Sequence, residues 1–382
     1  MTYVTVSELR KRYPDCEICL FNFSDQNSMD SDLAFKVVNV NPEAWNVIIK
    51  NEDIRTWIYL TGVMILRRIN FFRQIKETKE IMKSCDAIFD ISGYAISSQW
   101  GIRSTERKIS EVIFFDSCHI PFFMMPQSFG PFNYTKEKDC LIKRLNSALK
   151  TCRCVYARER EGYELLVNEI GLSNVRLSAD IVLQSRGINM SCVFKNVVER
   201  KEIRLSTEEN VAIIPNMRNF DHGDRKEILH LYDIIIEWLL EHHKNIYLIS
   251  HSEEDGEACR LIKDKFTDID GVRLLVDKID CFAFEDMIGQ FDFAVASRYH
   301  SVVHSYRNSV PCIVLGWATK YRSLTELFDQ EQYIFDVRTP NSFGGMTDAL
   351  EKMAENFKEE KEKISDKLVK IQDNNCFDQI DF

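Results

Sequence analysis

Hydrophobic and polar positions along the chain follow two patterns that alternate from one end to the other. Short apolar runs are separated by longer stretches in which apolar residues recur at helical spacing. Such alternation is typical of α/β domains built on parallel sheets. The runs predicted as strands are Cys16–Phe23, Phe35–Val40, Ala87–Ser92, Phe122–Gln127, Val155–Arg158, Val175–Ala179, Val211–Pro215, Ile246–Ser250, Val272–Val276, Phe293–Ser297, Cys312–Leu315 and Tyr333–Val337.

The stretches between these runs are predicted as helices. They are Thr2–Tyr13, Ile54–Lys83, Thr105–Cys118, Lys136–Cys152, Glu161–Ile170, Arg225–His243, Glu253–Phe266, Ala283–Phe291, Ser301–Asn308 and the charged amphipathic stretch Met346–Gln372.

A chain of 382 residues is long enough for two domains. The polar, irregular segment Leu183–Asn210 divides the pattern, and we predict a first lobe over residues 1–184 and a linker over 185–209. A second lobe over 210–345 and a C-terminal helix and tail over 346–382 complete the chain. We expect both lobes to be doubly wound, with ligands at the carboxyl ends of their strands and an active site between the lobes.

Charge and composition narrow the class of partner. A net charge of −10 argues against a nucleic-acid binder, although a cleft can be locally positive in an acidic protein. The first residues lack the apolar core of a signal peptide, and the longest apolar run, Trp57–Leu66, is shorter than the roughly 20 residues of a membrane span. We therefore expect a cytoplasmic protein.

The most informative stretch for chemistry is Phe291–His304. Arg298 and His300 fall where a strand ends and a helix begins, and free N–H groups at a helix start favour an anion. We predict a cationic pocket with one titratable proton donor. The alternative is that His300 caps the helix and Arg298 pairs with a surface acid. His300 and His304 have metal-like spacing, but no glutamate of an HExxH motif lies between them, and nothing in the sequence requires a metal.

Other polar residues also follow predicted strands. Arg218 comes just after Val211–Pro215 and could hold a carboxylate or a phosphate, or lie in a solvated loop. In the first lobe the corresponding residues are Gly93, Gln127, Ser128, Arg158 and Asp180. We predict that they line the cleft because they share the carboxyl-end position, although Gln127 and Ser128 could instead simply form a tight turn.

Taken in order, these segments resemble the polysaccharide pyruvyl transferase family. The matching pieces are the Gly93 turn, Pro126–Pro131, Tyr156–Glu159, Ala179–Val182, Arg218, Ser297–His300 and Val310–Pro311. The resemblance implies a fold like the GT-B glycosyltransferases, with the acceptor on the first lobe and the donor on the second.

The resemblance also implies the reaction. Phosphoenolpyruvate would be the donor substrate, no further cofactor would be needed, and a sugar of a surface polysaccharide precursor would receive a pyruvate ketal. Arg218 and Arg298 would bind the donor and His300 would be catalytic. Glu159 or Asp180 could activate the acceptor hydroxyl.

Two other functions stay open. One is a GT-B glycosyltransferase that uses a nucleotide sugar, although no motif for a base and diphosphate is visible. The other is a non-catalytic scaffold in envelope polysaccharide assembly, which the single glycine of Ser92-Gly93-Tyr94 would favour. A further hypothesis concerns Trp57–Arg73, whose aromatic and basic residues could contact the inner face of a membrane that holds a lipid-linked acceptor.

The first lobe is expected to lack its first strand. Residues Thr2–Tyr13 are predicted as a helix that enters the strand Cys16–Phe23. In a doubly wound lobe such a helix follows a strand of its own, which is usually central in the sheet. We therefore expect a natural start upstream of Met1, or a truncated and weakly stable chain.

Overall fold

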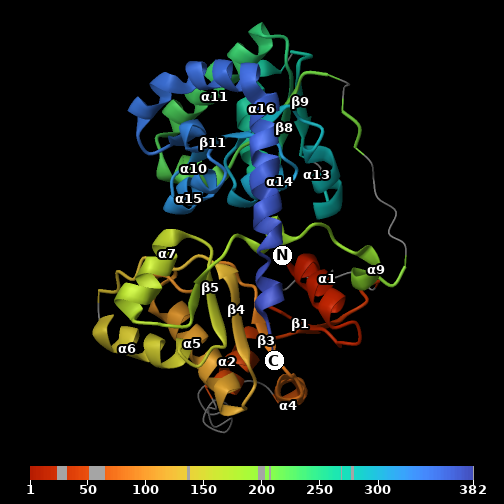
Figure 1. Ribbon diagram of the computed structural model, residues 1–382, viewed down its shortest axis with the longest axis vertical. Coiled ribbons are helices and arrows are strands. Elements are labelled where there is room, and N and C mark those ends of the chain that lie inside the picture. Colours follow the sequence, from red (N-terminus) through yellow and green to blue (C-terminus); the bar gives the residue numbers. More distant parts are fainter. Residues whose placement is uncertain are drawn as a thin grey trace. The chain divides into compact units, whose positions relative to one another are not determined.

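The computed structural model describes residues 1–23, 32–50, 65–135, 138–196, 203–205, 208–267, 269–276 and 279–381. The chain divides into two compact units, and no described sheet is shared between them (Figure 1). The first unit comprises Met1–Ile181, Ser185–Val198 and Asn375–Phe382, and the second comprises Val182–Gln184 and Glu199–Asn374.

The second unit is built on a six-stranded parallel sheet with the order β12-β11-β10-β7-β8-β9. The chain moves outward from β7 in one direction and then returns to the other side of β7 with β10. The topological switch point therefore lies between β7 and β10. The strands are β7 (Asn210–Ile214), β8 (Asn245–Ile249), β9 (Val272–Leu275), β10 (Phe293–Ala296), β11 (Cys312–Gly316) and β12 (Ile334–Asp336).

Long amphipathic helices cover this sheet. In α11 the side chain of Asp224 accepts hydrogen bonds from the first-turn N–H groups, and apolar residues from Ile228 to Leu239 form one buried stripe. This stripe packs with residues of α16 against β7, β8 and β10 in a single core. The helices are α10 (Met217–His222), α11 (Arg225–Glu241), α12 (Asp255–Lys263), α13 (Cys281–Ile288), α14 (Tyr299–Arg307), α15 (Thr319–Leu327) and α16 (Met346–Asp373).

The first unit contains a four-stranded parallel sheet, β3-β4-β5-β6, and a separate two-stranded parallel sheet, β1-β2. Its strands are β1 (Cys19–Asn22), β2 (Lys36–Asn39), β3 (Ile88–Asp90), β4 (Phe122–Gln127), β5 (Cys154–Ala157) and β6 (Val175–Leu177). Every residue of β4 and β5 is buried, which explains why both read as continuous apolar runs.

Helices of the first unit pack on both faces of the four-stranded sheet. Residues of α5 and α6 share one core with Phe122 and Val155, whereas Leu9 of α1 shares another with Phe123 and Tyr156. The helices are α1 (Thr2–Arg12), α2 (Pro42–Ile49), α4 (Ile65–Lys83), α5 (Ile102–Ser117), α6 (Lys138–Leu149), α7 (Arg160–Glu164) with the π-helical turn η2 (Leu165–Ile170), α8 (Ile181–Gln184) and α9 (Met190–Val193).

All twelve predicted strands are present, with ends shifted by a few residues. The structure adds helices that the pattern did not predict, including α2 and α15. Among the described strands, β1 and β3 each have a neighbour on one side. In the part of the chain that the structure describes, the strands of the first unit therefore form two separate sheets.

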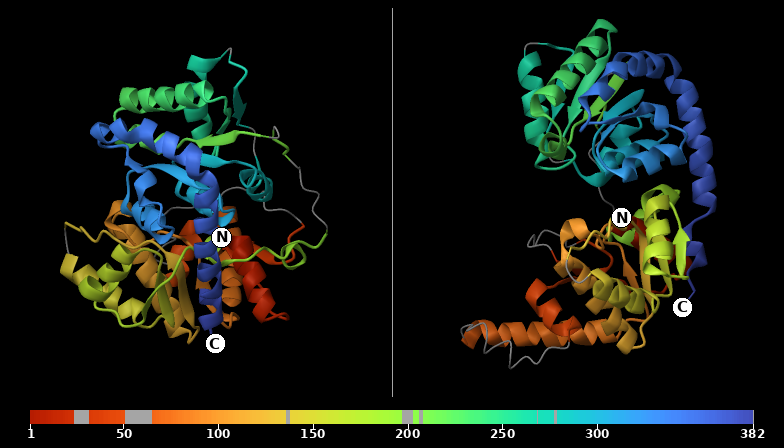
Figure 2. Two further views of the ribbon diagram at one scale, coloured as in Figure 1. Left: turned by 45° about the horizontal axis from the view of Figure 1, so that its top comes forward. Right: turned by 90° about the vertical axis from the view of Figure 1, so that its left-hand side faces the viewer.

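The tail after α16 belongs to the first unit, although we predicted residues 346–382 as one segment. The helix α16, dark blue in Figure 2, is assigned to the second unit. Beyond it, Cys376, Phe377 and Ile380 join the core that contains Leu9. The predicted linker also differs, because Ser185–Val198 is part of the first unit.

Candidate functional site

The carboxyl ends of β7, β8 and β10 meet at the switch point of the second unit. Asn216, which follows β7, donates a hydrogen bond from Nδ2 to the carbonyl oxygen of Ser297, which follows β10 (3.1 Å). Tyr321 donates its hydroxyl hydrogen to the same carbonyl (2.9 Å). Ligands of open α/β sheets bind in the crevice at such a point.

Arg298 occupies the N-cap position of α14 at this edge, and no side chain caps the helix. Its guanidinium makes a bidentate pair with the buried carboxylate of Asp255, through Nε to Oδ2 and Nη2 to Oδ1, both at 2.8 Å. Nη2 also donates to Oγ of Ser252 (3.0 Å). Burial alone would lower the pKa of Arg298, but the bonds to Asp255 and Glu254 outweigh burial and raise it. The arginine is therefore fixed in place and charged.

Glu254 connects the two arginines that the sequence singled out. One carboxylate oxygen, Oε1, pairs with Nη2 of Arg298, while the other, Oε2, lies 3.4 Å from Nη2 of Arg218. Arg218 is exposed and also pairs with Asp221 (3.2 Å). The structure thus brings Arg218 and Arg298 together around one shared carboxylate.

These contacts correct the predicted charge of the pocket. The sequence indicated a cationic pocket, but Asp221, Glu254 and Asp255 surround the two arginines. The alternative, that Arg298 pairs with a surface acid, holds for the partly exposed Glu254 and fails for Asp255, which is buried. An anionic ligand at this edge would have to replace Glu254 rather than enter a free cationic site.

Three histidines lie on or next to α14, the helix that begins after Arg298. His300 is in the first turn of α14, and its Nε2 atom is shielded from solvent. Burial, followed by the charges of His304 and His300, lowers the pKa of His251 to about 4. His304, one turn along α14, pairs through Nδ1 with Glu285. His304 is therefore held by a carboxylate of the neighbouring helix α13.

We predict that the depressed pKa of His251 makes stability depend on pH. Because the folded state binds the proton more weakly than the unfolded state, the free energy of unfolding should fall as pH drops from about 6.5 to about 4, by up to about 3 kcal/mol. Urea unfolding between pH 4 and 7 measures this slope. His251→Gln should flatten it, whereas replacement of the exposed His230 by Gln should not. Equal slopes in wild type and His251→Gln would refute the prediction.

The first unit holds a second polar cluster, again at strand ends. Arg158, after β5, donates from Nε and Nη2 to Oγ of Ser128 (3.0 and 2.8 Å) and from Nη1 to Oδ2 of Asp180 (2.9 Å). Glu159 accepts from Nε of Arg158 (2.9 Å) and from Oγ of Ser128 (2.7 Å). All four side chains are buried. The cluster is therefore a closed, internally bonded network.

Gln127 and Gly93 lie next to this network. Gln127 is fully buried and donates to Oδ2 of Asp90 (3.3 Å), which also pairs with Lys108 (3.2 Å). Gly93 has φ +76° and accepts the N–H of Ser128 at its carbonyl oxygen (2.9 Å). A glycine is needed here because the backbone is in the left-handed region.

The predicted site residues thus form two groups, one in each unit. Arg218, Arg298 and His300 lie at the edge of the six-stranded sheet, while Gly93, Gln127, Ser128, Arg158 and Asp180 lie at the edge of the four-stranded sheet. Five residues of the second unit near the arginines were not predicted from the sequence, namely Asn216, His251, Ser252, Glu254 and Asp255. The run from His251 to Asp255 lies just after β8. The expectation that ligands bind at the carboxyl ends of strands could therefore have identified these residues.

The segment predicted to contact a membrane, Trp57–Arg73, lies mostly outside the described residues. The structure does not describe residues 57–64 or several of the side chains that follow them. Among the described helices, none is both long and apolar enough to cross a membrane.

Several solved structures resemble the whole chain. Trehalose-6-phosphate synthase from E. coli, bound with UDP-2-fluoro glucose, matches with a TM-score of 0.53 and 12% identity over 98% of this chain and 93% of that chain. UDP-GlcNAc 2-epimerase from Methanocaldococcus jannaschii matches with a TM-score of 0.52 and 12% identity over 92% of this chain and 88% of that chain. At this identity the likeness shows the fold alone, which is GT-B.

Comparison with curated proteins finds no match. A family model, in contrast, covers most of the chain, including both polar clusters. It matches residues 1–319 and describes polysaccharide pyruvyl transferase. The chain therefore belongs to the polysaccharide pyruvyl transferase family.

Proposed function

We propose that this protein transfers a pyruvyl group from phosphoenolpyruvate to two hydroxyls of a sugar in a surface polysaccharide precursor, forming a cyclic ketal. The observation that carries the proposal is the pair of arginines at the switch point, Arg218 and Arg298, held around one carboxylate beside His300. Family membership supplies the class of reaction.

The arginine pair suits a donor with two anionic groups. Phosphoenolpyruvate carries a phosphate and a carboxylate, and guanidinium groups bind both in bidentate fashion. Glu254 places one carboxylate oxygen against each arginine, as a bridging anion would. The N-terminus of α14, which lacks a capping side chain, adds N–H groups at the same edge. Donor binding would displace Glu254 and leave Asp255 to fix Arg298.

His300 is assigned the proton transfer. Protonation of the enol carbon leaves an oxocarbenium-like centre, which the first sugar hydroxyl attacks. Departure of phosphate regenerates that centre, and the second hydroxyl closes the ring. Arg218 and Arg298 would stabilise the departing phosphate. We assign no general base, because Glu159 and Asp180 are both bonded to Arg158 within the closed network.

The test is release of phosphate from phosphoenolpyruvate by the purified chain in the presence of candidate sugar acceptors. We expect release that depends on the acceptor, together with a ketal in the product. Phosphoenolpyruvate should also raise the melting temperature, because a ligand of the native state stabilises it. Turnover of a nucleotide sugar instead would indicate a glycosyltransferase. Absence of turnover and of any thermal shift would indicate a scaffold.

Replacement of Glu254 by Gln is expected to improve donor binding. The neutral side chain no longer competes for Arg218 and Arg298. The KM for phosphoenolpyruvate should therefore fall about two- to fivefold, which corresponds to the free energy of an exposed ion pair. Steady-state kinetics with phosphoenolpyruvate varied measures this change. Glu253→Gln, at an exposed neighbouring position, is the matched control and should keep the wild-type KM. A higher KM in Glu254→Gln would mean that Glu254 helps to bind the donor.

A further inference from the structure

An exposed tryptophan lies on the loop that follows β3, at the carboxyl edge of the four-stranded sheet. Trp100 is the last residue of the short 3-10 helix η1 (Ser98–Trp100), and it is 54% exposed, more than any other large apolar residue that the structure describes. Single exposed apolar residues are common on protein surfaces, so the position and the neighbours of Trp100 decide what it can do. Its position is the edge at which ligands of parallel α/β sheets bind.

Tyr94 packs against this tryptophan. The two rings form an edge-to-face pair, with centroids 5.4 Å apart and planes at 77°. The hydroxyl of Tyr94 donates to the carbonyl oxygen of Gly130 (2.6 Å) and lies 3.2 Å from Oε1 of Gln99. Tyr94 is thus tied to the loop after β4 and supports the indole from the side. We call Tyr94 and Trp100 the aromatic platform.

The backbone beneath the platform is fixed by the same loop after β4. Both the N–H and the Oγ of Ser98 donate to the carbonyl oxygen of Pro131 (2.9 Å each). The N–H of Gly130 donates to the carbonyl oxygen of Ile96 (3.1 Å). Binding residues are often found on loops that a rigid scaffold holds in place, because little conformational entropy is then lost when a ligand binds. The platform meets this condition.

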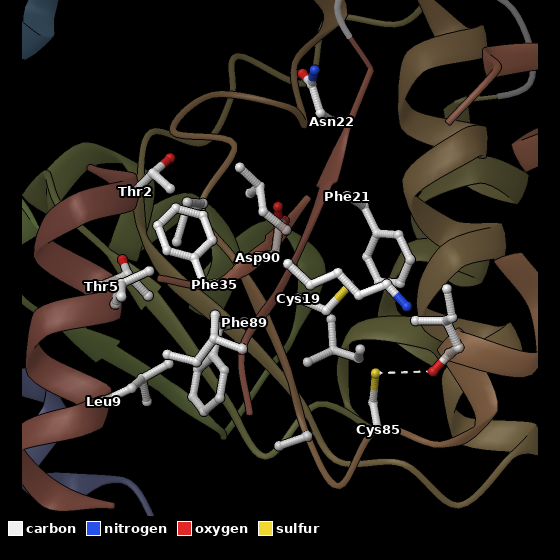
Figure 3. A pocket seen from close by; sticks show the side chains of 18 of the residues that line it. Thr2, Thr5, Leu9, Cys19, Phe21, Asn22, Phe35, Cys85, Phe89 and Asp90 are labelled. Atoms are coloured by element: carbon white, nitrogen blue, oxygen red, sulfur yellow. Dashed lines mark hydrogen bonds between the residues drawn. The ribbon is translucent and has the colours of Figure 1, made fainter. Parts of the chain in front are cut away.

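The platform is separate from the large cavity of the first unit. That cavity has a volume of about 1230 Å³ and is lined by residues of β1 and β3, among them Cys19 and Phe89 (Figure 3). Its lining combines apolar with charged residues, of which Asp90 and Lys108 are paired with each other (3.2 Å). Trp100 is not among the lining residues. A ligand on the exposed indole would therefore lie outside this cavity.

We propose that the aromatic platform binds a sugar ring of the acceptor saccharide, stacked on Trp100. A pyranose carries hydroxyls around its rim and C–H groups on its faces, and the slightly positive C–H hydrogens pack well on the negative face of an indole. The exposed amide of Gln99, next to Trp100, can bond to hydroxyls of the rim. Membership of a family that acts on polysaccharides favours a sugar over other apolar ligands. That this sugar is the acceptor rests on the proposed function.

Saturation-transfer NMR on the full chain, without phosphoenolpyruvate, tests the binding step. The probes are the methyl glycosides of glucose, galactose and mannose at millimolar concentration. At least one probe should receive saturation, chiefly at the C–H hydrogens of one face of its ring. Trp100→Ala should raise the Kd of that probe about tenfold, and Trp100→Phe should raise it less, because a smaller ring remains.

The control is Ile113→Ala, on α5. Ile113 is 51% exposed, close to the value for Trp100, so this variant removes a comparable exposed apolar side chain and should bind the probe as the wild type does. All three variants should keep a Tm close to that of the wild type, since the side chains removed are exposed. Absence of saturation transfer to every probe, or equal Kd values in Trp100→Ala and wild type, would overturn the proposal.

Kinetics separates this proposal from the proposed function. With an acceptor that supports phosphate release, Trp100→Ala should raise the KM for the acceptor about tenfold and leave the KM for phosphoenolpyruvate unchanged. An unchanged KM for the acceptor would overturn the platform while pyruvyl transfer stands. Sugar binding that depends on Trp100, without phosphate release with any acceptor, would support the platform as a carbohydrate site and overturn only the proposed function.

Discussion

The His300→Ala variant is expected to lose pyruvyl transfer by about 10²–10⁴-fold in kcat, the usual contribution of a positioned general acid. His300 lies in the first turn of α14, next to Arg298, so a proton donor there would be adjacent to the anion held by the arginines. The fold should persist, because the change removes one partly buried ring at a helix start. Phosphate release and ketal formation at saturating donor measure the loss.

The matched control for this variant lies one turn along the same helix. His304→Ala removes the pair with Glu285 but leaves the switch point unchanged, so Tm should fall while kcat stays close to the wild-type value. His300→Ala should also still bind the donor, which is measured as the rise in Tm that phosphoenolpyruvate produces. Equal activity in His300→Ala and wild type would remove His300 from the mechanism while leaving the arginine site intact.

Much of the fold follows from local pattern. The runs that became β4 and β7 are short, apolar and bounded by turn residues, and each is buried over its whole length. Runs of this kind are typical of parallel strands with helices on both faces. The helix α2 was missed although Asn41 and Pro42 form a helix-start signal, with Asn41 accepting N–H groups of the first turn. Its eight residues directly follow a strand, where a short apolar run is ambiguous.

The position of the candidate site was predictable from the sequence, but the ion-pair partners of its side chains were not. The expectation that ligands bind at the carboxyl ends of strands placed Arg298 and Arg218 at one edge of a sheet, and the structure agrees. It could not indicate that Asp255, 43 residues from Arg298 in sequence, neutralises the guanidinium. Such a pair depends on how β8 and β10 lie across the sheet, and no local signal encodes it. The same limit applies to Arg158, whose position suggested a ligand although its donors are bonded to buried neighbours.

The second large effect is expected in the first unit, for Arg158→Leu. This change leaves Glu159 and Asp180 buried without their cation, and an uncompensated buried charge costs about 3–5 kcal/mol of unfolding free energy. Hydrogen exchange of β4 and β5 measures the stability of this unit directly, which matters because the two units need not unfold together. Arg144→Leu is the control, since its pair with Glu106 is exposed and should be worth less than about 1 kcal/mol.

The double variant Arg158→Leu with Asp180→Leu separates structure from ligand binding. If the network only holds β4, β5 and the segment after β6 together, removing both partners should restore part of the stability lost in Arg158→Leu, because a buried ion pair can be replaced by apolar groups at small net cost. Turnover of a sugar acceptor by the double variant would then remain. Loss of acceptor turnover with stability restored would instead assign Arg158 or Asp180 to the acceptor.

The single variants also have an outcome that would contradict the prediction. If Arg158→Leu lowered the unfolding free energy no more than Arg144→Leu does, the network would be open to solvent. Its polar groups would then be available to a sugar.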